Sequence, residues 1–315
     1  LGRGQFVRAA VSAGQRSRGV EFSFTEPYFM DRRISAGFDL FNKQTDDTKY
    51  SRYTSWVTGG TVRFGIPITD ELTFSTRYSL YQSKIKIPNS KDKPFDDCST
   101  PIPGVTPGTP GAPLAFGPVY NCLTNGEASL AIKEARGSRI VSMPGYSLTY
   151  STIDNIKNPT SGFYLDFKQD IAGLGGDAKF LRTSGEARYY REITDDVVGF
   201  IKLQAGHIQG FGGEKLRMGD NYNLGPALVR GFAPNGIGPR DISNLADTRS
   251  NPLGGTTYFG GTAEVQFPIW GMPREIGLKG AVFADAGTLF GYKGETNYNK
   301  LLGLPAGTPC QATNV

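Results

Sequence analysis

The feature that most constrains this chain is a two-residue alternation of apolar and polar side chains, repeated in segments of about 10 to 15 residues. In the segment 72–87, Tyr78 and Leu80 fall on one face, whereas Arg77 and Ser79 fall on the other. This is the β-strand pattern, and no amphipathic helix longer than about two turns is expected. Eleven strands are predicted, at residues 3–14, 18–29, 33–44, 53–67, 72–87, 137–153, 162–173, 177–193, 197–209, 256–269 and 276–287.

The connections between the predicted strands alternate in length. Long loops are expected at 88–136 and 210–255, and short turns around residues 31–32, 69–71, 158–162, 194–196 and 271–273. Strands of this length, with short turns at one end and long loops at the other, are typical of a transmembrane β-barrel. A soluble β-sandwich, the alternative architecture, has shorter strands and loops that do not sort by end. We therefore predict an all-β fold, a transmembrane antiparallel β-barrel with a long extracellular loop at 88–136 and a lumen-inserted loop at 210–255.

A strand in lipid must pair on both sides, so the apolar row of each strand should face lipid and the polar row the lumen. Aromatic residues near strand ends would then form interfacial girdles, although ordinary strand composition explains any single one equally well. The candidates are Tyr28, Phe29, Tyr50, Tyr53, Tyr189 and Tyr190. Single-chain bacterial barrels have even strand numbers. Eleven strands, a start at Leu1 and a polar end at Val315 thus predict an incomplete barrel with two open edges.

Composition excludes several other classes. No apolar stretch approaches the roughly 18 residues of a membrane-spanning helix, and the mean hydropathy is −0.32. The 15 tyrosines and 20 phenylalanines disfavour intrinsic disorder, because disordered chains are poor in aromatic residues. Lys and Arg total 34 against 29 Asp and Glu, which gives a net charge of +5. These basic residues are scattered singly, so no nucleic-acid partner is predicted.

Cysteine and histidine suggest little covalent chemistry. Cys98 and Cys122 lie in one Pro/Gly-rich segment and suit a disulfide that closes the loop, whereas zinc is disfavoured by the absence of a CxxC pair and the presence of one histidine. That residue, His207, is interpreted as a polar lumen or rim residue rather than a catalytic base. No HExxH, Walker or GxSxG motif occurs. No catalytic residue, cofactor or metal is therefore predicted.

The segment 224–241, inside the predicted lumen loop, carries the most distinctive pattern. It is rich in glycine and proline and contains Arg230. A guanidinium in a confined interior needs an acidic partner, and strand parity offers Glu264 and Asp285 on inward-facing rows. A planar guanidinium bridging these carboxylates would lock the loop to the wall. The alternative interpretation is an exposed arginine in a flexible loop.

These residues belong to motifs that resemble those of the bacterial surface antigen family of outer-membrane β-barrel insertases. The matching segments are Val229-Arg230-Gly231-Phe232, Ile237-Gly238-Pro239-Arg240-Asp241, Phe283-Ala284-Asp285-Ala286-Gly287, Asp154 with Asn158-Pro159-Thr160-Ser161-Gly162, and Glu26-Pro27-Tyr28-Phe29. In the family the corresponding loop separates strands eleven and twelve of sixteen. The resemblance thus implies that this chain covers strands three to thirteen, and that the periplasmic repeats, both seam strands and the C-terminal aromatic lie outside it.

The resemblance further implies a function in outer-membrane protein assembly in a Gram-negative bacterium, without enzymatic chemistry. Expected partners are unfolded outer-membrane protein clients, periplasmic lipoproteins of an assembly complex, and outer-membrane lipid. Arg230 would clamp the lumen loop through Asp285 and Glu264. The alternatives are a two-partner secretion transporter or a translocation-assembly module of the same family, and a porin-like channel or barrel enzyme from another class.

Overall fold

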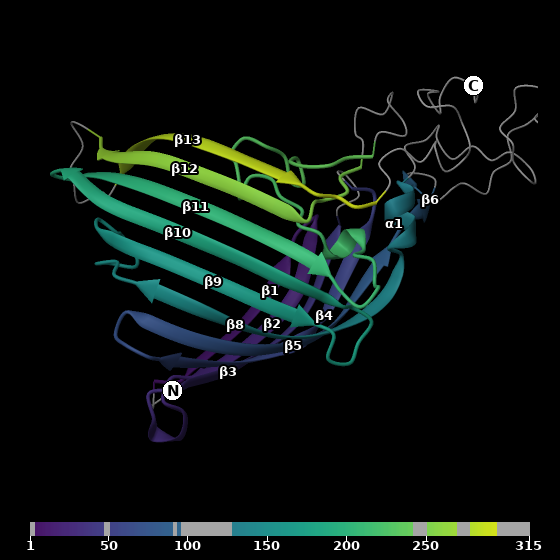
Figure 1. Cartoon of the computed structure of the whole chain (residues 1–315), viewed down its shortest axis with the longest axis horizontal. Coiled ribbons are helices and arrows are strands. Elements are labelled where there is room, and N and C mark those ends of the chain that lie inside the picture. Colours follow the sequence, from purple (N-terminus) through teal and green to yellow (C-terminus); the bar gives the residue numbers. More distant parts are fainter. Residues whose placement is uncertain are drawn as a thin grey trace, which may run out of the picture.

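The computed structural model describes residues 4–46, 51–90, 93–95, 128–241, 251–269 and 278–294 of the 315-residue chain. Eleven long strands form one antiparallel sheet in which neighbours in the chain are neighbours in space (Figure 1). The eleven predicted strands are confirmed, with ends displaced by no more than three residues. The strands are β1 (Phe6–Ala13), β2 (Ser17–Glu26), β3 (Ser35–Asp46), β4 (Thr54–Pro67), β5 (Leu72–Lys86), β8 (Gly137–Ser151), β9 (Gly162–Ala172), β10 (Phe180–Thr194), β11 (Val197–Gly210), β12 (Thr257–Pro268) and β13 (Lys279–Phe290).

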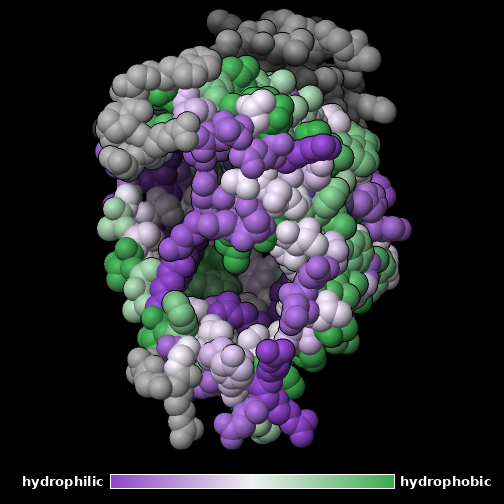
Figure 2. All heavy atoms as spheres, turned by 90° about the vertical axis from the view of Figure 1, so that its left-hand side faces the viewer, coloured by the Kyte–Doolittle hydropathy of each residue, from purple (hydrophilic) through white to green (hydrophobic). Residues whose placement is uncertain are grey.

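The sheet curls around a hollow and remains open along two edges. β1 and β13 are its outermost strands within the described residues, which agrees with the expected pair of open edges. Figure 2, which looks at the molecule from the left-hand side of Figure 1, shows the hollow with hydrophilic side chains around it. Short turns join the strands on that side, and longer connections and helix α1 (Leu130–Glu134) lie on the opposite side (Figure 1).

The remaining regular structure is small. The long connection from β5 to β8 contains the two-residue strands β6 (Asn89–Ser90) and β7 (Lys93–Pro94), together with α1. Single 3-10 turns occur at η1 (Phe29–Asp31) and η2 (Met218–Asp220). Across the described ranges, no helix has the length and apolar character needed to cross a membrane. The turn expected at 271–273 and the proposed Cys98–Cys122 disulfide lie outside the described residues.

The alternating pattern sorts side chains onto two faces of the sheet. On the outer face, large apolar side chains remain exposed, as for Leu203 at 58% and Phe259 at 53%. A soluble protein rarely leaves a contiguous apolar surface of this kind uncovered. The inner face carries charged residues that pair across strands, as in the ion pair between Arg77 and Asp170 at 2.6 Å. An apolar exterior around a polar interior matches the expected orientation of the two rows.

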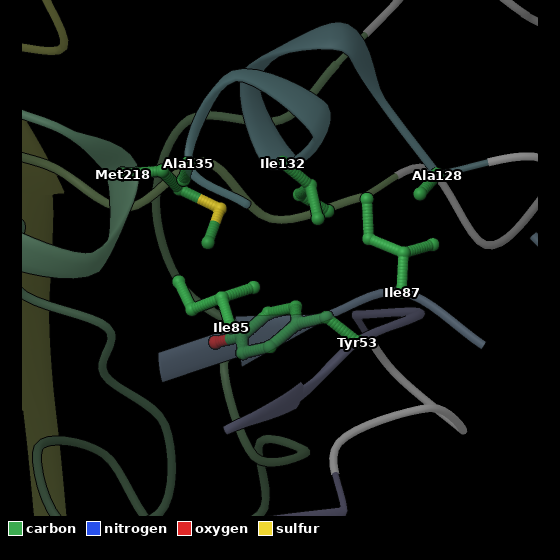
Figure 3. Packing of buried hydrophobic residues seen from close by; sticks show 7 residues of the cluster. All are labelled: Tyr53, Ile85, Ile87, Ala128, Ile132, Ala135 and Met218. Carbon is green, nitrogen blue, oxygen red and sulfur yellow. The ribbon is translucent and has the colours of Figure 1, made fainter. Parts of the chain in front are cut away.

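Apolar packing on the inner side is concentrated at the long-loop end. Ile132 of α1 is fully buried against Tyr53 and Ile85 of the wall, and Met218 joins them from the β11–β12 connection (Figure 3). This cluster thus ties the loop-side helix to the strand ends.

Two of the aromatic residues assigned to interfacial girdles were assigned wrongly. Tyr53 is only 8% exposed, because it packs in the cluster beneath α1. Tyr190 lies on the inner face, where its ring stacks on Phe200 with centroids 4.7 Å apart. Tyr28 and Phe29 are exposed as expected, whereas Tyr50 lies outside the described residues.

Candidate functional site at the lumen loop

The connection from β11 to β12, residues 211–256, is called the lumen loop below; residues 211–241 and 251–256 of it are described. It begins and ends one residue later than predicted. Isolated antiparallel bridges pair Tyr222 with Gly255, Leu224 with Ile237, and Arg240 with Pro252. The loop therefore folds back on itself as an ordered structure. This order fixes the backbone that carries Arg230.

Arg230 connects the tip of this loop to two strands of the wall. Its Nε and Nη2 atoms donate to the two carboxylate oxygens of Asp285 at 2.7 and 2.8 Å, and its backbone N–H donates to Asp285 Oδ2 at 3.0 Å. Its Nη1 atom donates to Glu264 Oε2 at 2.6 Å. The predicted pairing of Arg230 with both carboxylates is thus present in the structure, and the flexible-loop alternative is not.

The surroundings fix this guanidinium further. Its carbon lies 3.4 Å from the centre of the Phe283 ring, a close cation–π contact. The second oxygen of Glu264 accepts from Gln266 at 2.9 Å. The carboxylate side chains are only 5% and 12% exposed for Asp285 and Glu264, and that of Arg230 is 38% exposed. Each carboxylate therefore depends on the arginine for its counter-charge.

The electrostatics follow from these contacts. Hydrogen bonds to Asp285 and then to Glu264 raise the pKa of Arg230 above its usual value. The guanidinium therefore stays charged, and the loop tip carries a permanent cation that bridges β12 and β13. Arg230 makes a bidentate pair with Asp285 and a single hydrogen bond to Glu264. This combination restricts the guanidinium to one orientation and so fixes the position of the loop tip.

Leu228 and Val229, just before the arginine, are seated in a notch that the sequence analysis did not identify. Gly260 and Gly287 face each other across β12 and β13, and Leu228 is 2% exposed above them. A Cβ built on Gly260 would lie 2.2 Å from Leu228 Cδ1, and one on Gly287 would lie 2.8 Å from Leu228 Cγ. The wall therefore accepts the loop only where two facing side chains are missing. Glycine inside a strand is the sequence signal for such a close approach.

The other predicted motif residues shape the loop. Gly231 has φ of +90° and Gly238 has φ of +110°, a region that other residues enter at a cost. A Cβ on Gly238 would also come within 2.7 Å of Leu289 in β13. Phe232 is 49% exposed.

The second half of the motif closes the loop on its returning strand. Pro239 accepts a backbone hydrogen bond from Leu253 at 2.9 Å, and the buried Asp241 donates its N–H to Asn251 at 2.9 Å. Arg240 donates to the carbonyl of Asn235 at 3.2 Å. Gly238, Pro239, Arg240 and Asp241 therefore maintain the loop fold, whereas Arg230 attaches it to the wall.

A second ionic anchor, also not foreseen, holds the start of the lumen loop. Arg139 of β8 donates to the carboxylate of Asp220, and both side chains are about nine-tenths buried. Arg182 of β10 donates to the backbone oxygen of Asp220 at 2.9 Å. Breaking such a pair leaves a buried charge uncompensated. The loop is thus bound to β8 and β10 at one point and to β12 and β13 at another.

A third contact reaches a distant part of the wall. Asn235 donates to the hydroxyl of Ser51 at 3.1 Å, across 184 positions of sequence. Ser51 is fully buried just before β4. The lumen loop therefore extends from the β12–β13 side of the sheet to the β3–β4 side.

The one histidine of the chain lies away from the Arg230 contacts. His207 lies exposed on β11, where Nδ1 makes a hydrogen bond with the Thr257 hydroxyl at 2.7 Å. Within the described ranges, no three His, Cys, Asp or Glu residues are arranged to hold a metal ion. The arrangement can position a loop by charge and shape, which is a structural rather than a covalent task.

Comparison with known proteins gives this architecture a family. The model of the Omp85 superfamily domain matches residues 1–307. The chain belongs to the Omp85 superfamily. An Omp85 chain is a β-barrel membrane protein, in agreement with the apolar outer face and polar inner face described above.

Omp85 relatives among curated proteins carry assembly names. Outer membrane protein assembly factor BamA of Neorickettsia risticii is 30% identical over 287 residues, covering 90% of this chain and 33% of the relative. BamA of Neisseria meningitidis serogroup B is 22% identical over 92% of this chain and 34% of the relative. Sorting and assembly machinery component 50 homolog A of Xenopus laevis is 31% identical over 45% of this chain. The chain thus spans about one third of the BamA relatives it matches.

A solved structure confirms the Omp85 fold. BamA from Haemophilus ducreyi lacking POTRA domains 1–3 matches with a TM-score of 0.71 at 20% identity, covering 97% of this chain and 56% of that one. The relatives are named as assembly factors, which agrees with the expectation that the chain is not an enzyme.

Proposed function

We propose that this chain is part of the barrel of an outer-membrane protein assembly factor, an insertase that folds and inserts β-barrel proteins into the bacterial outer membrane. The support is the extent of the match: BamA of Neorickettsia risticii aligns with 90% of the chain, whereas the Xenopus relative aligns with 45%. Because the chain spans about one third of these relatives, the complete activity also depends on segments that such relatives carry beyond it.

The observation that carries the proposal is the Arg230 clamp on Asp285 and Glu264. A loop tied to the wall at Arg230 and again at Asp220 gives the barrel a fixed interior, while the edges that pair with clients belong to the seam strands expected outside this chain. Unpaired strand edges bind an incoming strand through main-chain hydrogen bonds. Strand templating forms no covalent bond, so it requires no catalytic residue and no cofactor.

The partners follow from the same proposal. Unfolded outer-membrane proteins are the clients, periplasmic lipoproteins complete the assembly complex, and outer-membrane lipid surrounds the apolar face. Local thinning of that lipid would lower the barrier to insertion.

A porin-like channel is disfavoured by the course of the lumen loop. The loop is attached to β12 and β13 through Arg230, and it contacts Ser51 ahead of β4 through Asn235. A segment lying between these two parts of the wall obstructs free diffusion. The two family alternatives, a two-partner secretion transporter and a translocation-assembly module, share the clamp, so the cargo must separate them.

Depletion of the full-length protein in its own cell tests the proposal. We expect a broad loss of folded outer-membrane β-barrels, seen as lost heat-modifiable bands on gels, with unfolded precursors accumulating in the periplasm. Loss of one secreted protein with normal barrel levels would favour a secretion transporter. Loss restricted to a few barrel clients would favour a translocation-assembly module. Loss of solute uptake alone would favour a channel.

A further inference from the structure

A groove on the outer face over β2, β3 and β4 stands out for its aromatic lining. It has a volume of about 450 Å³, and its walls include Phe24, Phe38, Val62 and Phe64. Gly60 lies on the same face, where a Cβ would come within 3.0 Å of Leu40 Cδ2. The missing side chain thus leaves room between the surrounding apolar groups. Because this face of an Omp85 chain lies in the membrane, the groove suits a hydrocarbon chain.

The β2–β3 turn adds an interfacial element to one end of this groove. Phe29 of the turn lines the groove, and its ring lies 6.2 Å from that of Phe64. Tyr28 and Met30 are 59% and 78% exposed, and the turn projects beyond the strand ends (Figure 1). Aromatic and apolar side chains at this level are typical of residues that sit at the boundary between headgroups and acyl chains.

The same turn then places two cations at that boundary. Met30 and Asp31 have φ of 55° and 57°, in the left-handed region, and Arg32 and Arg33 follow them directly. Both arginines are exposed, and neither makes an ion pair or side-chain hydrogen bond within the described part of the chain.

Two acids lie nearby: Asp31 in the turn, and Glu26, which ends β2 and lines the groove. The Glu26 carboxylate accepts hydrogen bonds from the Gln5 side chain and from the backbone N–H of Tyr28. The two arginines are therefore the groups in this turn that can bind a phosphate.

A second groove provides a contrast. It lies over β8 to β11 and the start of β5, has a similar volume of about 460 Å³, and is lined by side chains that include Leu148, Leu165 and Leu203. All of its lining residues belong to strands, and no turn residue extends it toward the headgroup level. The groove over β2 to β4 is therefore the one that joins an apolar slot to a cationic turn.

We infer that the groove over β2 to β4 and the β2–β3 turn form a binding site for an anionic phospholipid. One acyl chain occupies the groove between Phe24, Phe38 and Phe64, and Arg32 and Arg33 bind the lipid phosphate. The lipid comes from the leaflet at the short-turn end of the sheet. This site is separate from the lumen loop and does not depend on the proposed insertion activity.

Native mass spectrometry of the full-length protein in detergent tests the inference. The probes are phosphatidylglycerol and phosphatidylcholine with identical acyl chains, each titrated alone and then against inorganic phosphate. We expect one phosphatidylglycerol to be retained in preference to phosphatidylcholine, and free phosphate to leave it bound. Equal retention of both lipids, or displacement of phosphatidylglycerol by phosphate alone, would overturn the site.

Three variants separate headgroup from acyl chain. Arg32→Gln with Arg33→Gln should weaken phosphatidylglycerol binding by about fivefold for each arginine removed. Lys157→Gln with Arg191→Gln removes two exposed cations elsewhere at the same end and should leave the preference intact. Ala36→Trp fills the groove and should weaken both lipids.

The outcomes are unambiguous if heat modifiability shows each variant to be folded. Equal losses of phosphatidylglycerol binding in the two double variants would show that general charge, and not Arg32 and Arg33, causes the preference. Unchanged lipid binding in Ala36→Trp would show that no acyl chain occupies the groove. Either result contradicts the inference.

Discussion

Arg230 and Asp285 are joined by three hydrogen bonds, of which one comes from the main chain of the loop. The backbone N–H of Arg230 lies 3.0 Å from Asp285 Oδ2, and the side chain supplies the other two. Asp285 thus binds both the loop backbone and the Arg230 side chain.

Arg230→Lys should only partly preserve function, because an ammonium cannot present a planar fork to Asp285 while also reaching Glu264. Arg230→Ala should be more severe, because it leaves both carboxylates without their shared cation. The measurement is the level of folded outer-membrane barrels in cells that depend on the variant. Arg191→Ala, at an exposed site, is the matched control and should behave as wild type. Equal function of lysine and arginine at position 230 would contradict the bidentate role.

The glycine notch predicts a size-complementation effect. Gly260→Ala should destabilise the barrel by about 1 to 3 kcal/mol, because the new methyl overlaps Leu228. Adding Leu228→Ala to this variant should cost less than in the wild type, since the two changes relieve each other. Denaturant unfolding followed by heat modifiability measures both. Gly261→Ala, on the outer face with 3.3 Å to its nearest neighbour, should have little effect. Strict additivity of the two changes would argue against the notch.

The buried pair of Arg139 and Asp220 predicts an asymmetric response. Asp220→Ala should destabilise by about 3 to 5 kcal/mol, because it leaves the Arg139 guanidinium buried without a counter-charge. Replacing both, as in Arg139→Met with Asp220→Leu, should recover much of this loss. The unfolding midpoint in denaturant is the readout. A double variant as unstable as the single one would show that other contacts hold the start of the loop.

The β8–β9 turn predicts a response to acid. Asp154 accepts hydrogen bonds from the Thr160 hydroxyl, at 2.6 Å, and from the backbone N–H groups of Ser161 and Thr160. These bonds hold the pKa of Asp154 well below its usual value, with the Thr160 hydroxyl contributing most. A lowered folded pKa means that the stabilisation is complete above about pH 4 and is lost as the pH falls through the folded value.

The chemical shift of the Asp154 carboxyl carbon measures this directly. We expect it to titrate below the value of about 3.9 for an unperturbed aspartate, and the turn amides to change with it. Thr160→Val, which keeps the shape and removes the hydroxyl, should raise the midpoint. A midpoint near 3.9 in the wild type would contradict the turn geometry.

Much of this architecture could be predicted from the sequence, because apolar and polar residues alternate along a barrel strand. The point where this alternation stops marks the strand end to within a few residues. Parity alone assigned Glu264 and Asp285 to the inner face, and the family motif directed attention to Arg230. Tyr53 and Tyr190 show where that reasoning fails. Tyr190 shares the two-residue period of Arg188 and therefore lies on the inner face, and no local pattern shows that α1 covers Tyr53.

The anchors that were missed share a cause. The notch depends on Gly260 and Gly287 being opposite each other, which is a matter of register between two strands. The pair of Arg139 and Asp220 joins residues 81 positions apart across the loop entrance. Contacts of this kind follow from tertiary packing, and a single sequence carries no signal that selects one buried partner over another.

The most direct test of the lumen-loop account is a disulfide between the loop and the wall. In full-length protein with Cys98, Cys122 and Cys310 changed to serine, Leu228→Cys and Gly260→Cys should crosslink on mild oxidation, because Leu228 packs directly over Gly260. Gly261→Cys, on the outer face, should not crosslink with Leu228→Cys. Adding Arg230→Ala should sharply reduce the crosslink. A crosslink that fails to form, or that forms equally well without Arg230, would contradict the central claim that this arginine holds the loop on the wall.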